Sequence, residues 1–268
     1  MIAYLIRLAT LAGDGEWAIR LVPASCITLA AWAVYRLALR MFGERTAGLS
    51  LVLFLGLPIS QLGYLVASPD APLILFWTLT LYFAWLAVGE GRERFLPLVG
   101  LFAGLALLSK YTGVLLFPAL LLAFAASRHR RILARPGTCL AVLIALILFA
   151  PVLLWNSRHD WISFRFQLMH GTGGARTIDI RNAGDYLAGQ AFAVNPVLLL
   201  ALLYFALVRI RTNLRMEKLS FLLWPFLVTF GFFLWSSLHA GGEANWAAPA
   251  YVSGVLLLAW WIRKTGRR

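Results

Sequence analysis

Apolar positions occur along this chain in long blocks, and polar positions are confined to short breaks between them. The apolar blocks lie near residues 17–39, 46–67, 71–88, 95–110, 112–127, 137–155, 186–208, 219–237 and 245–262. A helix needs about 20 apolar residues to cross a bilayer core, whereas a transmembrane barrel shows alternating segments of about ten residues, which this sequence lacks. The pattern therefore predicts an all-α bundle of about nine transmembrane helices. Because no internal repeat or linker interrupts it, we expect a single domain over residues 1–268.

Composition supports a membrane protein. The chain is 61% hydrophobic and 13% charged, with a mean hydropathy of +0.80. A soluble domain of this size would not expose so much apolar surface. The net charge of +13 would suggest nucleic acid in a soluble protein, but here Lys and Arg follow the rule that basic loops stay in the cytoplasm. We therefore expect membrane lipid as a partner and no nucleic acid.

The basic loops also predict a topology. They lie at residues 36–45, 91–94, 128–135, 209–218 and 263–268, which places the C-terminus in the cytoplasm. Residues 95–127 lie between two of these loops and would measure roughly 50 Å as one helix, too long for a single crossing. We therefore expect the chain to reverse at residues 109–113, with Lys110 on the outward face.

In this topology most of the Asp and Glu side chains lie on the outward face. Of the 11 Asp and Glu residues, those that fall on it are Asp14, Glu16, Asp70, Asp160, Asp179, Asp185 and Glu243. Residues 1–12 are too short to cross and fit an interfacial helix on the same face. The middle of the apolar blocks is almost free of charge, which disfavours a proton- or ion-coupled transporter. No GxxxxGK[ST] or GxGxxG loop is present to hold a nucleotide, so an activated donor would be carried by a lipid.

The stretch "WNSRHDWISFRFQLMHG" (155–171) concentrates polar groups in an apolar chain. Arg158 and Arg165 offer forked donors that suit a phosphate, and Asp160 can orient His159 or an Arg. An alternative is a surface amphipathic helix whose aromatic rings lie at headgroup level. Two Arg, two His and an Asp among the rings favour a site for a phosphate and a polar ligand.

Asp70 and Lys110 are the other charged candidates. Asp70 opens an outward helix in "SPDAPL" (68–73), where it would serve either as an N-cap or as a base for a hydroxyl group. Lys110 is one of three lysines in the chain; it would either extend to lipid headgroups or bind a lipid phosphate.

A further outward loop, "HAGGEANWAAPAY" (239–251), supplies His239, Glu243 and Asn245. Together with His159, Asp160 and His170 they form the candidate substrate cavity. The histidines and Glu243 lack the local spacing of a metal site, so no metal ligands are assigned, although a divalent metal cofactor stays an alternative.

Several segments, in order along nearly the whole chain, resemble those of bacterial polyprenyl-phosphate-sugar glycosyltransferases of the GT-C superfamily. This superfamily includes protein O-mannosyltransferases, the lipid A aminoarabinose transferase and rhizobial galacturonosyltransferases. The segments are "GDGEWAIRLVPA" (13–24), "ALRMFGERTAGLS" (38–50), "SPDAPLILFWTLTLYF" (68–83), "GLALLSKYTGVLLFPALLL" (104–122), "PVLLWNSRHDWISFRFQ" (151–167) and "ANWAAPAY" (244–251).

The resemblance implies a multi-pass enzyme of the bacterial inner membrane. It would take a sugar from a polyprenyl phosphate and transfer it, with inversion, to a periplasmic acceptor such as lipid A, a glycan or a protein. It also implies Lys110, Arg158 and Arg165 as contacts of the donor phosphate and Asp70 as the catalytic acidic residue.

One difference from the family pattern concerns the N-terminal region. Family members begin with a helix and an acidic periplasmic loop that carries the base, and the present sequence is expected to start after that point. Either the start lies further upstream, or the chain is a short form in which Asp70 replaces the usual base. The alternatives to transfer are an inactive homologue that binds polyprenyl phosphate, and a lipid or solute transporter.

Overall fold

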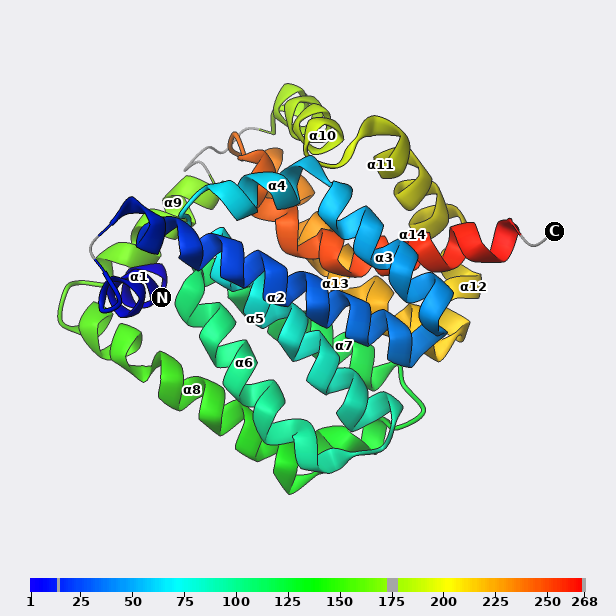
Figure 1. The fold of residues 1–268 in the computed structure, drawn as a ribbon, viewed down its shortest axis with the longest axis horizontal. Helices are drawn as coiled ribbons and strands as arrows, with labels where there is room; N and C mark the ends of the chain where they lie inside the picture. The colour runs from blue at the N-terminus through cyan, green and yellow to red at the C-terminus, as the bar shows by residue number, and fades with distance from the viewer. Residues whose placement is uncertain (14, 173–177, 267–268) are drawn as a thin grey trace.

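The computed structural model describes residues 1–13, 15–172 and 178–266. Every secondary-structure element in these ranges is a helix, so the predicted all-α class is confirmed (Figure 1). Asp14 lies outside the described residues, and the expectations that concern it stay predictions.

The helices follow the apolar blocks of the sequence. The α-helices are α1 (Ile2–Thr10), α2 (Glu16–Phe42), α3 (Glu44–Gly56), α4 (Pro58–Leu65), α5 (Asp70–Ala84), α6 (Leu96–Ser109), α7 (Leu116–Ala125), α8 (Pro136–Ser157), α9 (Ile162–Thr172), α10 (Ile180–Val194), α11 (Pro196–Leu203), α12 (Ile210–Arg215), α13 (Glu217–Ser237) and α14 (Ala248–Thr265). Short 3-10 or π-helical turns are η1 (Trp85–Gly89), η2 (Glu93–Phe95), η3 (Tyr111–Leu115), η4 (Arg130–Ala134), η5 (Tyr204–Val208) and η6 (Ala244–Ala247).

Fewer than the nine expected helices are by themselves long and apolar enough to cross a membrane. Four helices are long and apolar enough to cross, namely α2, α5 extended through η1, α8 and α13, and two bent pairs raise the number to at most six in the described chain. The pairs α3 with α4 and α10 with α11 bend by 65° and 112°. Pro58 and Pro196 begin the second helix of each pair, and the residue before a proline is driven out of the helical region. The count of nine is therefore not confirmed.

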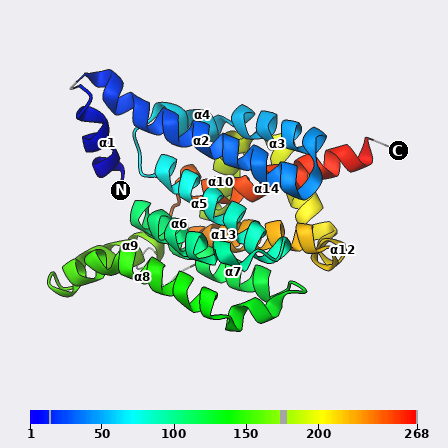
Figure 2. The same cartoon turned by 60° about the horizontal axis from the view of Figure 1, so that its bottom comes forward.

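The most buried helices are α5 and α14, which lie inside the bundle. By contrast, α8 buries only Ala141, Ala145, Phe149 and Asn156 and turns most of its leucines outward. Figure 2 shows α8 and α9 along one side of the bundle and α2 with α3 along the opposite side. An apolar helix with so exposed a face is typical of contact with lipid, so we interpret α8 as an outer wall of the bundle.

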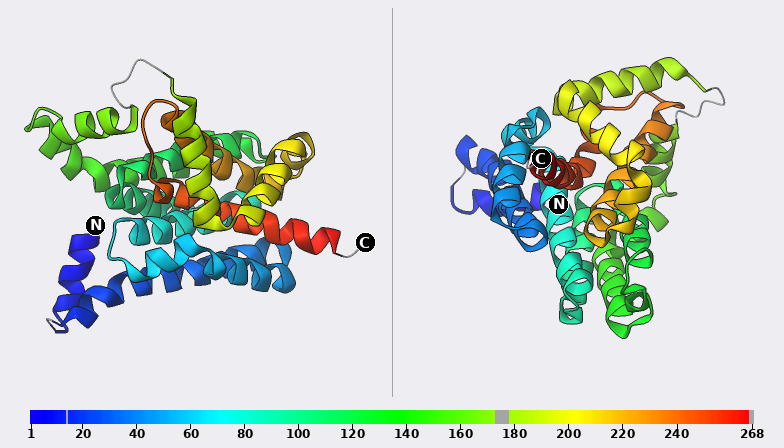
Figure 3. Two further views of the ribbon diagram at one scale, coloured as in Figure 1. Left: turned by 90° about the horizontal axis from the view of Figure 1, so that it is seen from above. Right: turned by 90° about the vertical axis from the view of Figure 1, so that its right-hand side faces the viewer.

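The basic loops meet at one end of the bundle. Residues from 41–46, Arg128, 215–218 and 260–264 line one cavity, and Arg135 forms an ion pair of 3.5 Å with Glu93 of a further loop. We call this the basic end. Figure 3 (left) shows the C-terminus and α12 toward this end and α1 with α9 toward the opposite end, which we call the site end.

The chain reverses at Lys110, as the sequence predicts. Helix α6 ends at Ser109, Lys110 is extended (φ −154°, ψ 141°), and η3 leads into α7. Gly113 permits this reversal because a Cβ there would lie 2.7 Å from backbone atoms of Ala106. Both flanks of residues 95–127 therefore lie at the basic end, and Lys110 lies at the site end.

Candidate functional site

Three predicted site residues meet at the site end. Lys110 Nζ lies 2.7 Å from Asp70 Oδ1, and Asn245 Nδ2 donates a hydrogen bond of 2.9 Å to Asp70 Oδ2. The residues come from the start of α5, the reversal after α6 and the start of η6. The folded chain thus gives each oxygen of one carboxylate its own partner.

The local structure of α5 corrects one interpretation of Asp70. The N-cap of α5 is Pro69, and Asp70 is the first residue of the helix. Its backbone N–H donates to Ser68 Oγ (3.3 Å), so Ser68 partly meets the need for a capping acceptor. The Asp70 side chain does not cap; it turns toward Lys110 and Asn245, while its charge still suits the positive end of the helix dipole.

Burial explains why Asp70 needs two partners. The residue is only 8% exposed, and an ionised carboxylate removed from water is costly unless it is paired and hydrogen-bonded. The ammonium group of Lys110 balances the charge, and the Asn245 amide satisfies the second oxygen. Loss of Lys110 would therefore leave Oδ1 without its partner, and loss of Asn245 would leave Oδ2 with only the longer hydrogen bond from Ser68 Oγ (3.4 Å).

A buried amide fixes the loop that carries Asn245. Gln190 of α10 is fully buried, donates from Nε2 to the carbonyl of Ala244 (3.1 Å) and accepts a hydrogen bond from the Tyr251 hydroxyl (2.6 Å). Ala244 immediately precedes Asn245, so Gln190 positions the partner of Asp70. Gln190 is not among the residues that the polarity pattern predicts, although an amide within the apolar run 186–208 is a signal that could have identified it.

A cavity of about 560 Å³ adjoins Lys110. Its polar lining includes Lys110, His170 and Glu243. Aromatic rings line it from η3, α8, α9, α13 and η6, namely Tyr111, Phe149, Phe164, Phe166, Phe232, Phe233 and Trp246. The cavity therefore presents one cationic edge and long apolar walls.

Residues 155–171 supply one wall of this cavity. Asp160 and Trp161 adopt positive φ (51° and 57°) and turn the chain between α8 and α9. The Tyr111 hydroxyl donates to Ser163 Oγ (3.2 Å), and Ser163 in turn donates to Asn156 Oδ1. These bonds join α9 to both η3 and α8, so the wall is attached to the reversal that holds Lys110.

Of the remaining predicted residues, some line the cavity and others lie outside its lining. His170 stacks on Phe166 and lies 5.3 Å from Trp246 between ring centroids, within the cavity lining. Arg158 and Arg165 are exposed and do not belong to that lining.

His159 and His239 also lie outside the lining. Nδ1 of each donates one hydrogen bond to a Trp carbonyl, His159 to that of Trp155 (2.7 Å) and His239 to that of Trp235 (3.0 Å). Asp160 makes no ion pair with His159 or with either Arg within the described part of the chain, so the expected orienting contact is not present there.

The described residues contain no group of three or more His, Cys, Asp or Glu side chains that could hold a metal ion. In particular, His159, His170, His239 and Glu243 do not converge there. We call Asp70, Lys110 and Asn245 the Asp70 cluster. Its cationic side chain, Lys110, lines the cavity.

Comparison with known proteins gives a consistent result. A model of the dolichyl-phosphate-mannose-protein mannosyltransferase family matches residues 1–155. Among curated proteins, the lipid A galacturonosyltransferase RgtD of Rhizobium johnstonii is 30% identical over 266 residues, which are 97% of this chain and 55% of RgtD.

Two solved structures share the fold. ArnT from Cupriavidus metallidurans bound to undecaprenyl phosphate superposes with a TM-score of 0.73 at 19% identity, over 97% of this chain and 49% of ArnT. The archaeal oligosaccharyltransferase AglB from Archaeoglobus fulgidus, in complex with an inhibitory peptide and a dolichol-phosphate, gives a TM-score of 0.62 at 16% identity, over 98% of this chain and 42% of AglB. The chain thus spans about half the length of the relatives it matches.

Proposed function

The chain belongs to the dolichyl-phosphate-mannose-protein mannosyltransferase family of GT-C glycosyltransferases, and on this premise we propose that it transfers a sugar from a polyprenyl-phosphate donor to an acceptor. The acceptor class is a lipid A, a glycan or a protein. We propose that residues 1–268 act as one domain of a bacterial inner-membrane protein, with the site end in the periplasm and the basic end in the cytoplasm.

The position of Lys110 carries this proposal. Its ammonium group stands at the edge of the cavity of about 560 Å³, whose walls are mainly aromatic and aliphatic side chains. A polyprenyl phosphate is complementary to this cavity, because it has an anionic head and an apolar chain. A compact cation suits the phosphate, and the rings suit the first part of the isoprenoid chain, whose remainder would extend into the bilayer.

The reaction exchanges one bond at the anomeric carbon for another. The bond from the sugar C1 to the phosphate oxygen breaks, the acceptor oxygen bonds to C1 from the opposite face, and the acceptor proton passes to a base. Lys110 would stabilise the charge that develops on the departing phosphate. Asp70 stays the predicted base, and the same carboxylate holds Lys110 in position before the donor binds.

Other polar groups receive secondary roles in the proposal. His170 and Glu243 line the cavity and are candidates for contacts with the sugar or the acceptor. Arg158 and Arg165 stay predicted phosphate contacts, and their exposure suits a headgroup that approaches from the membrane surface. His159, Asp160 and His239 stay predicted cavity residues.

Binding without transfer is a second candidate, and one observation favours it. Both oxygens of Asp70 are already engaged, by Lys110 and by Asn245. A carboxylate in this arrangement must give up or share a partner before it accepts a proton. The alternative of a lipid or solute transporter has no such support, because the charged residues of α2, α5 and α13 lie toward the helix ends.

The experiment separates donor binding from transfer in membranes that contain the full chain. Binding of radiolabelled polyprenyl-phosphate sugar and its transfer to membrane acceptors are measured for the wild type, Lys110→Met, Lys110→Arg and Asp70→Asn, with Arg130→Gln as a control at the basic end. Lys110→Met is expected to weaken donor binding by at least tenfold, and Lys110→Arg to retain more of it.

Asp70→Asn distinguishes the two candidate functions. If Asp70 is the base, this variant keeps donor binding and loses at least 100-fold in kcat. If Asp70 only holds Lys110, KM rises with a smaller change in kcat. Donor binding without transfer by the wild type would favour the binding-only function, and unchanged donor binding by Lys110→Met would refute the proposed phosphate contact.

A further inference from the structure

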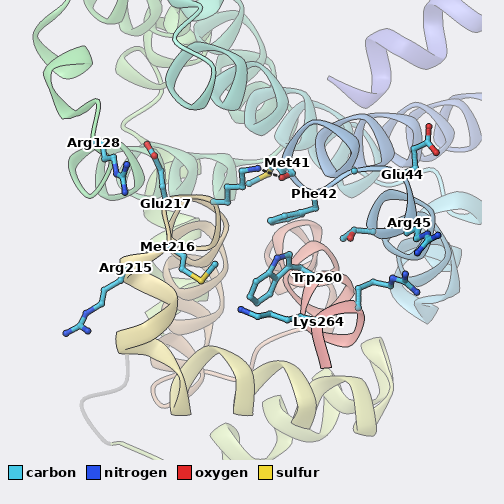
Figure 4. Close-up of a pocket in the computed structure, with 14 residues that line it drawn as sticks. Met41, Phe42, Glu44, Arg45, Arg128, Arg215, Met216, Glu217, Trp260 and Lys264 are labelled. Carbon is cyan, nitrogen blue, oxygen red and sulfur yellow. Dashed lines mark hydrogen bonds between the residues drawn. The ribbon is translucent and has the colours of Figure 1, made fainter. Parts of the chain in front are cut away.

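A second cavity, of about 950 Å³, lies at the basic end, remote from the Asp70 cluster. It is formed where the turn between α2 and α3, the end of α12, the start of α13 and the last turn of α14 come together (Figure 4). None of the roles proposed above uses it.

The charged lining of this cavity is strongly cationic. Its lining contains two carboxylates, Glu44 and Glu217, and six cationic side chains, which leaves a formal excess of four positive charges. The six cationic residues are Arg45, Arg128, Arg215, Lys218, Arg263 and Lys264. Two of the three lysines of the chain are among them.

These cations have no carboxylate partner among the described residues. None of the six forms an ion pair within 4 Å with a described Asp or Glu. Elsewhere at the same end Arg40 and Arg92 pair with Glu90, and Arg135 pairs with Glu93. The topology rule requires basic loops at this face, but it does not require six cations without a described carboxylate partner to line one cavity.

Aromatic rings occupy the centre of the cavity. Phe42 and Trp260 lie side by side with ring centroids 6.3 Å apart, and Glu44 lies at the periphery (Figure 4). Lys264 Nζ is 4.8 Å from the Trp260 ring and Lys218 Nζ is 5.9 Å from the Phe42 ring. Cations over an apolar floor suit a ligand that is anionic at one end and apolar next to it.

Two polar atoms at this cavity are buried without a hydrogen-bond partner among the described residues, Arg263 Nε and Glu217 Oε1. An unmatched guanidinium N–H is costly when it is shielded from water, and an anionic oxygen would satisfy it. Lys218 also donates to the carbonyl of Met41, which keeps its ammonium group beside Phe42.

We propose that this cavity binds a phosphate-bearing group, with Lys218 and Lys264 beside the phosphate and with Phe42 and Trp260 under the adjoining apolar part. Two sources have this chemistry, the headgroup of an anionic phospholipid and a soluble phosphate or pyrophosphate. A basic pocket between helices at the cytoplasmic surface is a typical place for the former. The site is independent of the transfer reaction.

The test measures binding to the purified full chain in detergent micelles. Phosphatidylglycerol is titrated and counted on the protein by native mass spectrometry, phosphatidylcholine serves as the zwitterionic comparison, and inorganic pyrophosphate serves as competitor and as a ligand of its own. The variants are Lys218→Gln with Lys264→Gln, the charge-preserving Lys218→Arg with Lys264→Arg, and a matched control, Arg130→Gln with Arg211→Gln. The control removes the same charge from exposed basic-loop positions outside the cavity.

We expect saturable binding of phosphatidylglycerol that pyrophosphate competes away. The Gln pair should weaken it on the order of tenfold, and the Arg pair and the control should bind like the wild type. Binding of pyrophosphate but not of phosphatidylglycerol, with the same pattern among variants, assigns the site to a soluble anion. Equal loss in the Gln pair and in the control means that only the general charge of this face matters and overturns the proposal, as does the absence of binding by either probe.

Discussion

Asp70 depends on two residues that are 40 and 175 positions away in the chain. Lys110 and Asn245 each approach a different oxygen, so together they fix both the charge balance and the orientation of the carboxylate. Asn245 contributes without charge, and Gln190 holds its loop through Ala244. The orientation of Asp70 is thus set by an amide network that reaches into α10.

Substitution of Asn245 should expose this dependence. Asn245→Ala removes the hydrogen bond to Asp70 Oδ2 and should destabilise the protein by about 1–2 kcal/mol, because hydrogen bonds to charged groups are worth more than neutral ones. Asn245→Asp should cost more, because it places a second carboxylate beside the first. Thermal unfolding in detergent measures both changes.

Glu243→Gln is the control for these substitutions. Glu243 is exposed in the same loop and makes no side-chain hydrogen bond within the described ranges. Its replacement should leave the unfolding temperature nearly unchanged. Equal stability of Asn245→Asp and the wild type would contradict the role assigned to Asn245.

At the scale of residues, the sequence could identify candidates but not their pairing. The pattern indicates Asp70, Lys110 and Asn245 because each is polar in an outward loop of an apolar chain. That Lys110 reaches Asp70 depends on how α5 and α6 pack, which the polarity pattern does not specify. Arg158 and Arg165 were selected by the same rule, yet the turn at Asp160 and Trp161 leaves them outside the cavity lining.

Among the elements, α6 and α8 pack through small residues. Gly100 and Gly104 lie four positions apart on α6 and face Ala141 and Ala145 of α8. A Cβ at Gly100 would lie 2.6 Å from Ala141 Cα, and one at Gly104 would lie 3.0 Å from Ala145 Cα. This is the small-xxx-small arrangement that allows helix backbones to approach closely in membranes.

Gly100→Val should separate these helices. The added atoms would overlap the backbone of α8, which cannot rotate away as a side chain can, so we expect a loss of roughly 3 kcal/mol or more in stability. Because α6 leads to Lys110 and α8 leads to the α9 wall, donor binding should weaken as well. Thermal unfolding and the donor-binding assay measure the two effects.

Gly231→Val on α13 is the matched control. A Cβ at Gly231 meets no described heavy atom within 4 Å, so the same substitution there should change stability by less than about 1 kcal/mol. A similar loss at both glycines would show that valine itself, and not the α6–α8 contact, causes the effect.

The helices were more predictable than their geometry. Each apolar block of the sequence corresponds to helical structure because a bilayer-length apolar run has few other ways to satisfy its backbone. The bends at Pro58 and Pro196 were not predicted, although a proline marks each one. The pattern predicts one transmembrane helix for each of the blocks 46–67 and 186–208, because hydropathy is insensitive to a local break.

In the molecule as a whole, the basic loops and the candidate site residues lie at opposite ends. The basic loops converge at one end, and Asp70, Lys110, His170, Glu243 and Asn245 lie at the other. This arrangement agrees with the polarity that the loop charges predicted, and the orientation in the membrane follows from it as a proposal.

Labelling of single cysteines tests that orientation. After Cys26 and Cys139 are replaced by Ala, His129→Cys places an exposed thiol at the basic end, and His159→Cys places one at the site end. A membrane-impermeant maleimide should label His159→Cys in intact spheroplasts and His129→Cys only in inverted vesicles. The opposite pattern would reverse the proposed orientation, and the cysteine-free chain controls for background.

The wide separation of the Asp70 partners also orders events during synthesis. Asp70 and Lys110 leave the ribosome within one stretch and can pair as soon as α5 and α6 have inserted. Asn245 emerges much later, shortly before α14, and Gln190 must already be in place to receive its loop. In a nascent chain the Asp70 carboxylate therefore lacks its Asn245 hydrogen bond until the segment before α14 is in place. Formation of this bond is thus among the last steps in the assembly of the described bundle.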